Sequence, residues 1–332
     1  SYGTTRGAAL AEKLLDLGVA LSGLILVSCA MDLQGIVFEP RNDLPFALFL
    51  PGFASVAQYH GKLSGKLGES PEQARAAAEE FVTGDYLAAL HAGARIAATA
   101  RRRVARRIGE LTGLPAALVE EFNLRVDDQS FFVELLRDRG RIVGRLEARV
   151  TGPMAAKRLR SWEFDPGIEA LAAPYTMAAH AYMSEQLGVD TQARYEVLAH
   201  DVHRQWNWNR GESKGNGYAS TSPDLSRALR RNPHLRVLVA SGRYDLGTPY
   251  SATDWSLAQL DVPADVLARV EHHYYDAGHM MYTREADMMK LERDLAAWLA
   301  RGSACATRDT TGGHGDDLFA AGVTTSRPSS TA

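Results

Sequence analysis

The chain has few cysteines, no long apolar run and no excess of charge of either sign. Its two cysteines, Cys29 and Cys305, cannot build a disulfide framework. No apolar run reaches the roughly 18 residues that a membrane-spanning helix needs, and no signal peptide is visible. Lys and Arg number 37 against 40 Asp and Glu, which gives a net charge of −3. This balance argues against nucleic acid or an anionic membrane as the main partner, and favours small or peptidic substrates.

Signatures of nucleotides, metals and cofactors are also missing. We therefore expect no cofactor and no metal. His200 and His203 have the i, i+3 spacing that a metal could use, but no third ligand lies at a recognisable distance. We interpret a cluster of arginines as the solvated face of a helix rather than an anion site; its members are Arg101, Arg102, Arg103, Arg106 and Arg107.

What is present is the composition of an ordinary globular protein: 332 residues, of which 45% are hydrophobic and 23% charged. An Ala- and Leu-rich helix opens the chain. The apolar run at 24–28 predicts a fully buried parallel strand, and β-branched runs predict two more strands at 235–240 and 270–275. Apolar periodicity predicts helices at 72–82, 86–111, 130–139, 174–187, 194–206, 223–231, 249–260 and 284–299.

These elements predict an α/β fold whose core is interrupted by a long helical insertion. Pro40, Pro45 and Pro51 make 34–67 look irregular, as in a segment that crosses a surface cleft. Beyond Gly302 the periodicity is lost, which predicts a disordered tail. The expected organisation is a first core segment at 1–34, a mainly helical cap at 35–220, a second core segment at 221–302 and a tail at 303–332.

Ser1 is the candidate nucleophile. Ser1-x-Gly3 is the second half of G-x-S-x-G, the strand-to-helix turn that presents the serine of α/β-hydrolases. The first half is missing, so we expect the chain to be the C-terminal part of a longer protein. Two other interpretations stay open: a frayed terminus without function, and an N-terminal nucleophile that uses its own amine as base.

An acid and a base follow the two late strands. Asp245 comes after the strand at 235–240, and His279 comes after the strand at 270–275. Acyl transfer needs a nucleophile, a base that can return its proton and an acid that orients this base. Ser1, Asp245 and His279 supply all three in the chain order of α/β-hydrolases.

Other residues compete for each of these roles. Gly211 to Gly215 form a complete G-x-S-x-G around Ser213, but no buried strand precedes it. Ser70 precedes Pro71 and fits a helix N-cap. Asp276 lies three residues before His279 on the same loop, yet Asp245 has the better strand context. His272 and His273 alternate within a strand, and His314 lies in the expected tail.

Several stretches resemble the serine carboxypeptidases, more specifically their bacterial branch. They are Ser1-Tyr2-Gly3, Asn232-Pro233 with the strand to Val239, Gly242-x-x-Asp245 with Thr248-Pro249, and Ala277-Gly278-His279-Met280, together with 123–125, 134–138, 144–146 and 217–218. The resemblance implies an α/β-hydrolase fold with a large insertion, release of C-terminal amino acids from peptides with a free carboxylate, and a periplasmic or secreted location.

The resemblance also implies a role for each matching residue. Ser1 would be the nucleophile, His279 the general base and acid, and Asp245 its orienting partner. The backbone N–H of Tyr2 would donate to the oxyanion, and Met280 would face the departing residue. A core-packing role for Met280 remains open.

Two features of that family are missing from the chain. They are the glutamate before the nucleophile, which helps to hold the substrate carboxylate, and an upstream glycine segment that supplies the second oxyanion donor. Only three core strands are visible. We therefore expect residues 1–332 alone to fold poorly and to hydrolyse no peptide, an expectation that measurable turnover would refute. The alternatives are an esterase or acyltransferase on the same triad, and a catalytically dead binding module.

Overall fold

The structure is a computed structural model of an α/β protein in two compact units, Ser1–Lys290 and Leu291–Ala332. It describes residues 1–332 apart from 158–159, 191–195, 197–198, 208–217 and 310–332. Within this described part, no helix is both long and apolar enough to cross a membrane.

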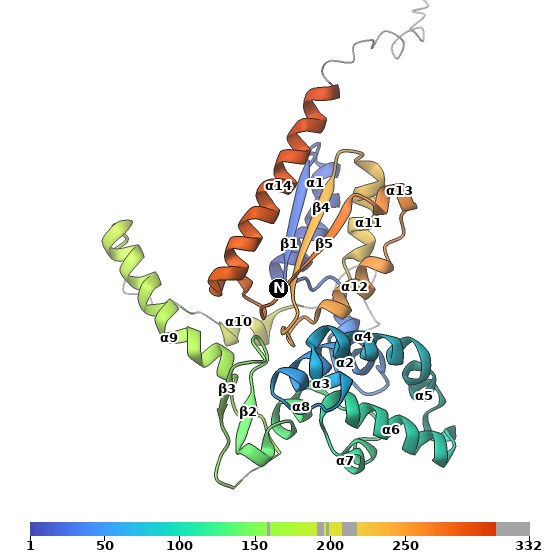
Figure 1. Ribbon diagram of the computed structural model, residues 1–332. Coiled ribbons are helices and arrows are strands. Elements are labelled where there is room, and N and C mark those ends of the chain that lie inside the picture. Colours follow the sequence, from blue (N-terminus) through green and yellow to red (C-terminus); the bar gives the residue numbers. More distant parts are fainter. Residues whose placement is uncertain (158–159, 191–195, 197–198, 208–217, 310–332) are drawn as a thin grey trace, which may run out of the picture. The chain divides into compact units, whose positions relative to one another are not determined.

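Three parallel strands form the main sheet, in the order β1–β4–β5 (Figure 1). They are β1 (Gly23–Val27), β4 (Arg236–Gly242) and β5 (Val270–Tyr275). In the register, Leu26 of β1 lies beside Val239 of β4, which lies beside His272 of β5. The sequence predictions of these three strands and of their parallel direction are confirmed.

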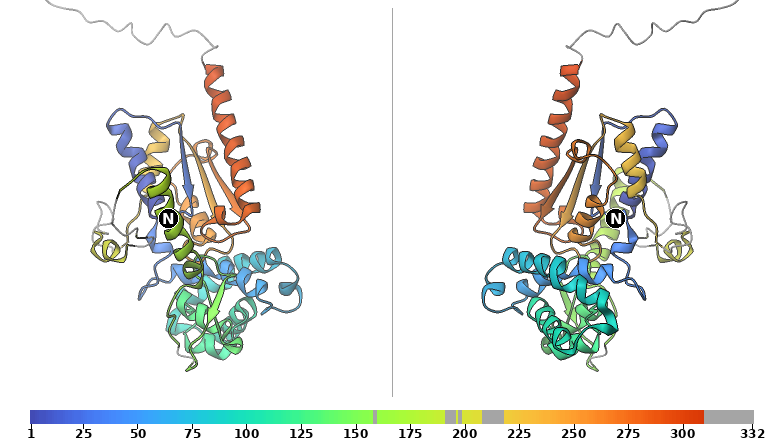
Figure 2. Two further views of the ribbon diagram at one scale, coloured as in Figure 1. Left: turned by 90° about the vertical axis from the view of Figure 1, so that its left-hand side faces the viewer. Right: turned by 90° about the vertical axis from the view of Figure 1, so that its right-hand side faces the viewer.

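Two helices cover one face of this sheet: α1 (Tyr2–Asp16) and α11 (Ser222–Arg231), which lie side by side in Figure 2. Gly7 of α1 is close to the sheet, since a Cβ there would lie 3.5 Å from a methyl group of Leu24. Ala8 and Leu229 are fully buried in the apolar layer between helices and strands. The helix expected at the start of the chain is therefore confirmed.

The burial predicted for β1 is wrong. Ile25 keeps 40% of its surface exposed, and Leu26 is the only fully buried residue of the strand. Among the described strands β1 pairs with β4 alone, so it forms an edge of the sheet. A continuous apolar run does not by itself distinguish an edge strand from a central one.

The segment between β1 and β4 is mainly helical. Its elements are η1 (Leu33–Gly35), α2 (Leu44–Tyr59), α3 (Lys66–Glu69), α4 (Pro71–Phe81), η2 (Val82–Tyr86), α5 (Leu87–Ala92), η3 (Gly93–Arg95), α6 (Ala98–Thr112), α7 (Ala116–Glu121), α8 (Asp128–Glu134), η4 (Arg137–Arg139), β2 (Arg141–Val143), β3 (Thr151–Pro153), α9 (Pro166–Ala181), η5 (Tyr182–Gln186) and α10 (His200–Gln205). Strands β2 and β3 pair as an antiparallel hairpin. The elements from α2 to α8 enclose a second apolar core, in which Phe53 stacks on Phe131 at 4.1 Å.

Three predictions for this segment are wrong. Residues 34–67 are not irregular, because they contain α2, which accommodates Pro51 within its length. Eleven consecutive residues of α2 around Pro51 are buried, and this packing outweighs the poor helix propensity of proline. The predicted helix 86–111 is broken at Gly93, where φ is +53°. Helix α9 begins at Pro166, where Asp165 caps it, rather than at 174.

Among the helices after β4, the two long ones were predicted from the sequence and the two short ones were not. They are α12 (Tyr250–Ala258), α13 (Ala264–Leu267), η7 (Met281–Thr283) and α14 (Glu285–Asp309). Helix α14 continues ten residues beyond its predicted end at 299. The disorder expected at 303–332 is wrong for 303–309, which belong to α14, and the remainder of the expected tail, 310–332, lies outside the described residues.

Asp128 at the start of α8 gives the protein a pH-dependent stability. Burial raises the pKa of this carboxyl group to about 6, although the backbone N–H of Gln129 and the charge of Arg145 oppose the shift. Ionisation of Asp128 therefore costs stability as the pH rises through 6. We expect Asp128→Asn to raise the free energy of unfolding by about 1–3 kcal/mol at pH 7.5 and to leave it unchanged below about pH 4. Urea unfolding of the wild type and of Asp128→Asn between pH 4 and pH 7.5 measures this difference in the free energy of unfolding. A difference that does not change with pH would contradict the prediction.

Candidate active site

Asp245 and His279 lie together where the strands of the main sheet end. Asp245 follows β4 and His279 follows β5, and the two strands are parallel neighbours. The Nδ1 of His279 is 2.7 Å from Oδ2 of Asp245. The carboxylate side chain has no exposed surface, and 13% of the imidazole is exposed. The pairing expected from the sequence is thus present as a hydrogen bond.

The carboxylate of Asp245 is held by the turn that follows it. Its Oδ1 accepts the backbone N–H groups of Gly247 at 2.7 Å and Thr248 at 3.0 Å, and its Oδ2 accepts the Thr248 hydroxyl at 2.8 Å. Burial alone would raise the pKa of Asp245, but His279 and the Thr248 donors overcome it and lower the pKa below its usual value. The group is therefore an ionised, immobile acceptor for the imidazole.

Ser1 is the N-cap residue of α1, and the first turn of α1 is tied to the segment after β1. The Thr4 N–H donates to the Ser1 carbonyl oxygen at 2.8 Å. The Thr4 hydroxyl in turn accepts the N–H of Ala30 at 2.9 Å, and the Thr5 hydroxyl donates to the Ala30 carbonyl at 2.5 Å. These contacts hold Ser1 near the carboxyl ends of the strands, where Figure 1 marks the N-terminus.

A cavity of about 520 Å³ has both Ser1 and His279 in its wall. Its other lining residues are Arg145, Leu146, Ile168, Leu171, Ala172, Tyr175, Ala179, Gly247, Thr248, Met280 and Tyr282. No hydrogen bond joins Ser1 to His279 among the contacts of the described residues. The charge of Asp245 nevertheless acts on the Ser1 amino group, whose pKa is lowered by burial and raised in part by that carboxylate. All three predicted triad residues therefore meet at one place.

The two remaining predicted site residues are at the same place. Tyr2 follows Ser1 as the first residue of α1, where backbone N–H groups of a helix lack partners within the helix. Met280 follows His279 and lines the cavity. The positions fit the roles expected for both residues, while the roles themselves remain predictions.

The loop of the β2–β3 hairpin joins the acid loop to the histidine loop. The Arg145 carbonyl accepts the N–H of Leu246, and the Leu146 carbonyl accepts the N–H of His279 at 2.7 Å. Glu147 Oε2 accepts the N–H of Gly278 at 3.0 Å. No local pattern in the sequence indicates a role for this loop at the site, although 144–146 is one of the stretches that carry the family resemblance.

Ser28 supports the histidine loop from the other side. It follows β1, is buried, and has a positive φ of +54°, which is costly for a residue with a side chain. Its hydroxyl donates to the His279 carbonyl oxygen at 2.5 Å. The strained backbone thus places a donor against the loop that carries the imidazole, a function that the apolar pattern of β1 could not indicate.

Gly242 at the end of β4 lets the histidine loop lie against the strand. A Cβ at this position would collide with the carbonyl oxygens of Ala277 and Gly278. We expect Gly242→Ala to lower the free energy of unfolding by about 1–3 kcal/mol, because the added Cβ forces the histidine loop away from the strand. Gly84→Ala is the matched control, since its Cβ meets nothing within 4 Å. Equal free energies of unfolding of the two variants in urea would contradict the role assigned to Gly242.

A second Ser-His-Asp chain of hydrogen bonds lies within the sheet. His272 contacts Ser241 through Nε2 at 2.9 Å and Asp254 through Nδ1 at 2.8 Å. Ser241 has no exposed surface, so a substrate carbonyl cannot reach its hydroxyl. This chain therefore links β4 and β5 to α12 and is not a candidate for acyl transfer.

The other sequence candidates lie apart from the cavity or outside the described residues. Asp276 pairs with Arg284 at 2.6 Å, and Ser70 caps α4 by accepting the N–H of Gln73. Ser213 and the side chains of His200 and His203 are outside the part described. Elsewhere in the described chain, no group of three or more metal-ligating side chains is present.

The arginine cluster on α6 has polar neighbours of its own. Arg107 pairs with Glu110 at 3.0 Å, Arg103 lies 3.6 Å from Asp85, and Arg101 donates to Asn123 at 2.6 Å. These contacts agree with a solvated helix face.

Comparisons of the chain with protein-family models, curated proteins and solved structures found no match in any of the three.

Proposed function

We propose that the chain carries the catalytic triad of a serine carboxypeptidase, with Ser1 as nucleophile, His279 as general base and acid, and Asp245 as orienting acid. The observation that carries the proposal is the cavity whose wall contains Ser1 together with an imidazole hydrogen-bonded to a buried carboxylate. The proposal extends to the fold. The main sheet would belong to an α/β-hydrolase core, and the helical segment between β1 and β4 would be its cap.

The proposed reaction is an acyl transfer through Ser1. Asp245 engages Nδ1 of His279, which makes Nε2 the nitrogen for proton transfer. Nε2 takes the Ser1 hydroxyl proton as Oγ bonds to the substrate carbonyl carbon, and the N–H of Tyr2 stabilises the resulting oxyanion. The proton then passes to the leaving amine as the peptide bond breaks. Water, deprotonated by His279, hydrolyses the ester and restores the Ser1 hydroxyl.

Arg145 is the feature that favours a carboxypeptidase over an esterase or acyltransferase. It lines the cavity beside His279 and Met280, and its guanidinium makes no hydrogen bond or ion pair with any residue that the structure describes. The positive charge of Arg145 lowers the pKa of Asp128 and so opposes part of the effect of burial on that carboxyl group. A guanidinium fork binds a carboxylate through two parallel hydrogen bonds, which suits the free terminus of a peptide. Apolar residues of α9 form another part of the wall, where side chains of the substrate can pack.

Arg145→Met tests this assignment in the full-length gene product. We expect kcat/KM for a blocked dipeptide with a free C-terminal carboxylate to fall about 100-fold, because the charged hydrogen bonds are lost. The methyl ester of the same dipeptide lacks the carboxylate, so its turnover should change by less than about threefold. Arg145→Lys is the control, and it should retain part of the preference for the free acid. Equal losses on both substrates would assign Arg145 a structural role.

The same pair of substrates separates the alternative functions. A carboxypeptidase releases the C-terminal residue of the free acid and rejects a peptide whose terminus is amidated. An esterase or acyltransferase turns over the ester without needing a carboxylate nearby. A catalytically dead binding module turns over neither. Release of amino acid from the amidated peptide at the rate of the free acid would overturn the carboxypeptidase assignment.

A further inference from the structure

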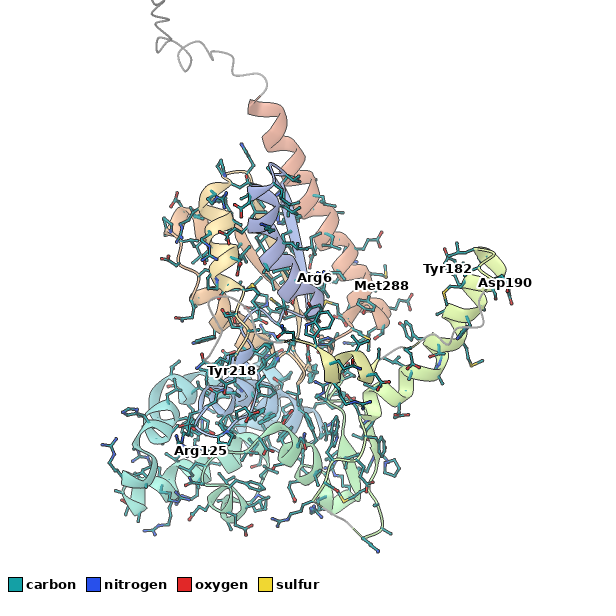
Figure 3. The ribbon with its side chains drawn as sticks, turned by 180° about the vertical axis from the view of Figure 1, so that it is seen from behind. Arg6, Arg125, Tyr182, Asp190, Tyr218 and Met288 are labelled. Carbon is teal, nitrogen blue, oxygen red and sulfur yellow. The ribbon has the colours of Figure 1, made fainter. Side chains whose placement is uncertain are left out.

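Hydrogen bonds hold the backbone of His279 and of the residue before it. The N–H of His279 donates to the Leu146 carbonyl oxygen at 2.7 Å, and the His279 carbonyl oxygen accepts the Ser28 hydroxyl at 2.5 Å. The N–H of Gly278 donates to Oε2 of Glu147 at 3.0 Å. Glu147 lies in the loop between β2 and β3, a hairpin that is labelled in Figure 1 and drawn with its side chains in Figure 3. Of these partners, Glu147 alone is a charged side chain.

Arg149 fixes the carboxylate of Glu147 in this position. Its Nε donates to Oε1 at 2.8 Å and its Nη2 donates to Oε2 at 2.8 Å, so the two side chains form a bidentate ion pair. The backbone N–H of Arg149 also donates to Oε1, at 3.2 Å. A bidentate pair of this kind adds geometric specificity to its energy. Oε2 of Glu147 is therefore held in place for the N–H of Gly278.

Arg149 also joins this pair to the end of β4. Its guanidinium carbon lies 4.3 Å from the ring centre of Tyr244, a buried residue that directly precedes the acid. A guanidinium over the face of a tyrosine ring is attracted by the π electrons. The N–H of Tyr244 donates to the Ala277 carbonyl oxygen at 3.0 Å, and its own carbonyl oxygen accepts the N–H of Ala148 at 3.1 Å. The ion pair therefore connects the loop that carries the acid to the loop that carries the histidine.

Gly278 lets the hairpin loop lie directly against the histidine loop. A Cβ at this position would collide with the Leu146 carbonyl oxygen and lie 2.8 Å from Cα of Glu147. Two backbones this close leave no room for the histidine loop to shift toward the hairpin. The hydrogen bond from Gly278 to Glu147 opposes the opposite movement, away from the hairpin.

The ion pair is more than an attachment of the hairpin, because backbone hydrogen bonds already tie the hairpin loop to both catalytic loops. Only 26% of the Glu147 side chain and 13% of the Arg149 side chain are exposed, so both groups have lost much of their hydration. Apolar residues of similar volume could replace such a pair with little loss of stability. They could not supply an acceptor for the N–H of Gly278.

We propose that Glu147 is a positioning residue for His279. Its carboxylate fixes the peptide group that precedes His279 and so keeps Nδ1 of the imidazole within hydrogen-bond distance of Asp245. The role of Glu147 rests on the proposed function of His279 as base, and it deepens that function by naming the side chain that holds the base in place.

The proton between Nδ1 of His279 and Oδ2 of Asp245 reports the position of the imidazole. In the proton NMR spectrum of the full-length gene product it gives a resonance downfield of the amide protons, which is assigned by its loss in His279→Ala. Glu147→Met keeps the shape of the side chain and removes the acceptor. We expect it to shift this resonance upfield and to broaden it, because a freer loop lengthens the hydrogen bond. Glu147→Gln keeps an acceptor oxygen for the N–H of Gly278 and should restore the resonance.

Turnover of a blocked dipeptide with a free C-terminal carboxylate gives a second measurement. We expect Glu147→Met to lower kcat about 30- to 100-fold, because a displaced imidazole transfers the proton poorly. KM should change by less than about threefold, because the N–H of Arg145 is held separately by Asp165 at 3.1 Å. Glu147→Gln should stay within about fivefold of the wild-type kcat. Glu147→Ala gives the same contrast with Glu147→Gln if Glu147→Met does not fold.

Asp43 provides the matched control. Its carboxylate forms a bidentate pair with Arg125, which is labelled in Figure 3, and both contacts are 2.7 Å long. Neither residue lines the cavity of Ser1 and His279. Asp43→Leu removes an ion pair of the same kind and should leave the low-field resonance and kcat unchanged. Equal effects of Asp43→Leu and Glu147→Met, or a Glu147→Gln variant that behaves like Glu147→Met, would overturn the proposal.

The spectrum needs no substrate, so the two proposals can fail separately. A resonance that responds as expected in a protein that releases no amino acid would support the role of Glu147 and refute the peptidase activity. Turnover in a protein whose resonance does not respond to Glu147→Met would refute the role of Glu147 and leave the peptidase activity standing.

Discussion

Replacing Ser1 by alanine in the full-length gene product should lower kcat/KM for release of a C-terminal residue by about 10⁴- to 10⁶-fold. The loss is this large because the proposed mechanism forms the acyl-enzyme on the Oγ of Ser1, and no other described serine shares a cavity wall with His279. Amino-acid release from a blocked dipeptide measures it.

The fold should survive this substitution. Ser1 is exposed, and its side chain makes no capping hydrogen bond to α1. We therefore expect the free energy of unfolding to change by less than about 1 kcal/mol. Ser213→Ala is the matched control, because Ser213 belongs to the complete G-x-S-x-G of the chain and should be dispensable. Retained turnover in Ser1→Ala, or its loss in Ser213→Ala, would remove Ser1 from the mechanism.

Asp245→Asn should lower kcat/KM by about 10³- to 10⁴-fold. An asparagine can still accept the N–H groups of Gly247 and Thr248 at its oxygen. Its amide would then point N–H bonds at Nδ1 of His279, which forces the proton to the wrong nitrogen and removes the base. Asp276→Asn is the control, since Asp276 lies near His279 in the chain but pairs with Arg284. Equal effects of the two substitutions would contradict the assignment of Asp245.

The same variant should show a pH-dependent change in stability. Because the pKa of Asp245 is lowered in the folded protein, its ionisation stabilises the fold above the usual carboxyl pKa. That contribution is lost as the pH falls through the lowered value. The difference in free energy of unfolding between wild type and Asp245→Asn should therefore be largest near neutral pH and shrink below about pH 4. A difference that does not vary with pH would contradict the ionised state of Asp245.

The parts of the site that follow strands could be predicted from the sequence. Asp245 and His279 each come directly after a β-rich run, and neighbouring parallel strands end at one edge of a sheet. The first helix could also be predicted, because its apolar residues repeat with helical spacing. Ser1 lies at the same edge of the sheet because α1 packs beside β1. The sequence indicates this packing, since the first helix is followed directly by an apolar run that is typical of a strand.

The supporting contacts could not be predicted in this way. Arg145 and Leu146 reach the site from a hairpin loop about 100 residues before Asp245, and no local pattern fixes such a contact. Ser28, whose φ is positive, donates its hydroxyl to the His279 carbonyl oxygen, a partner 251 residues away in the chain. Helix α2 was missed for a related reason, since burial around Pro51 decides its structure and local propensity does not.

Labelling with a fluorophosphonate tests the central claim most directly. The reagent bonds its phosphorus to the oxygen of an activated serine and releases fluoride, and it needs no carboxylate-binding group. We predict that mass spectrometry finds the label on Ser1, in the tryptic peptide that ends at Arg6. Labelling should persist in Arg145→Met and Asp276→Asn and disappear in His279→Ala. A label on a different serine, or equal labelling of Ser1 without His279, would contradict the account.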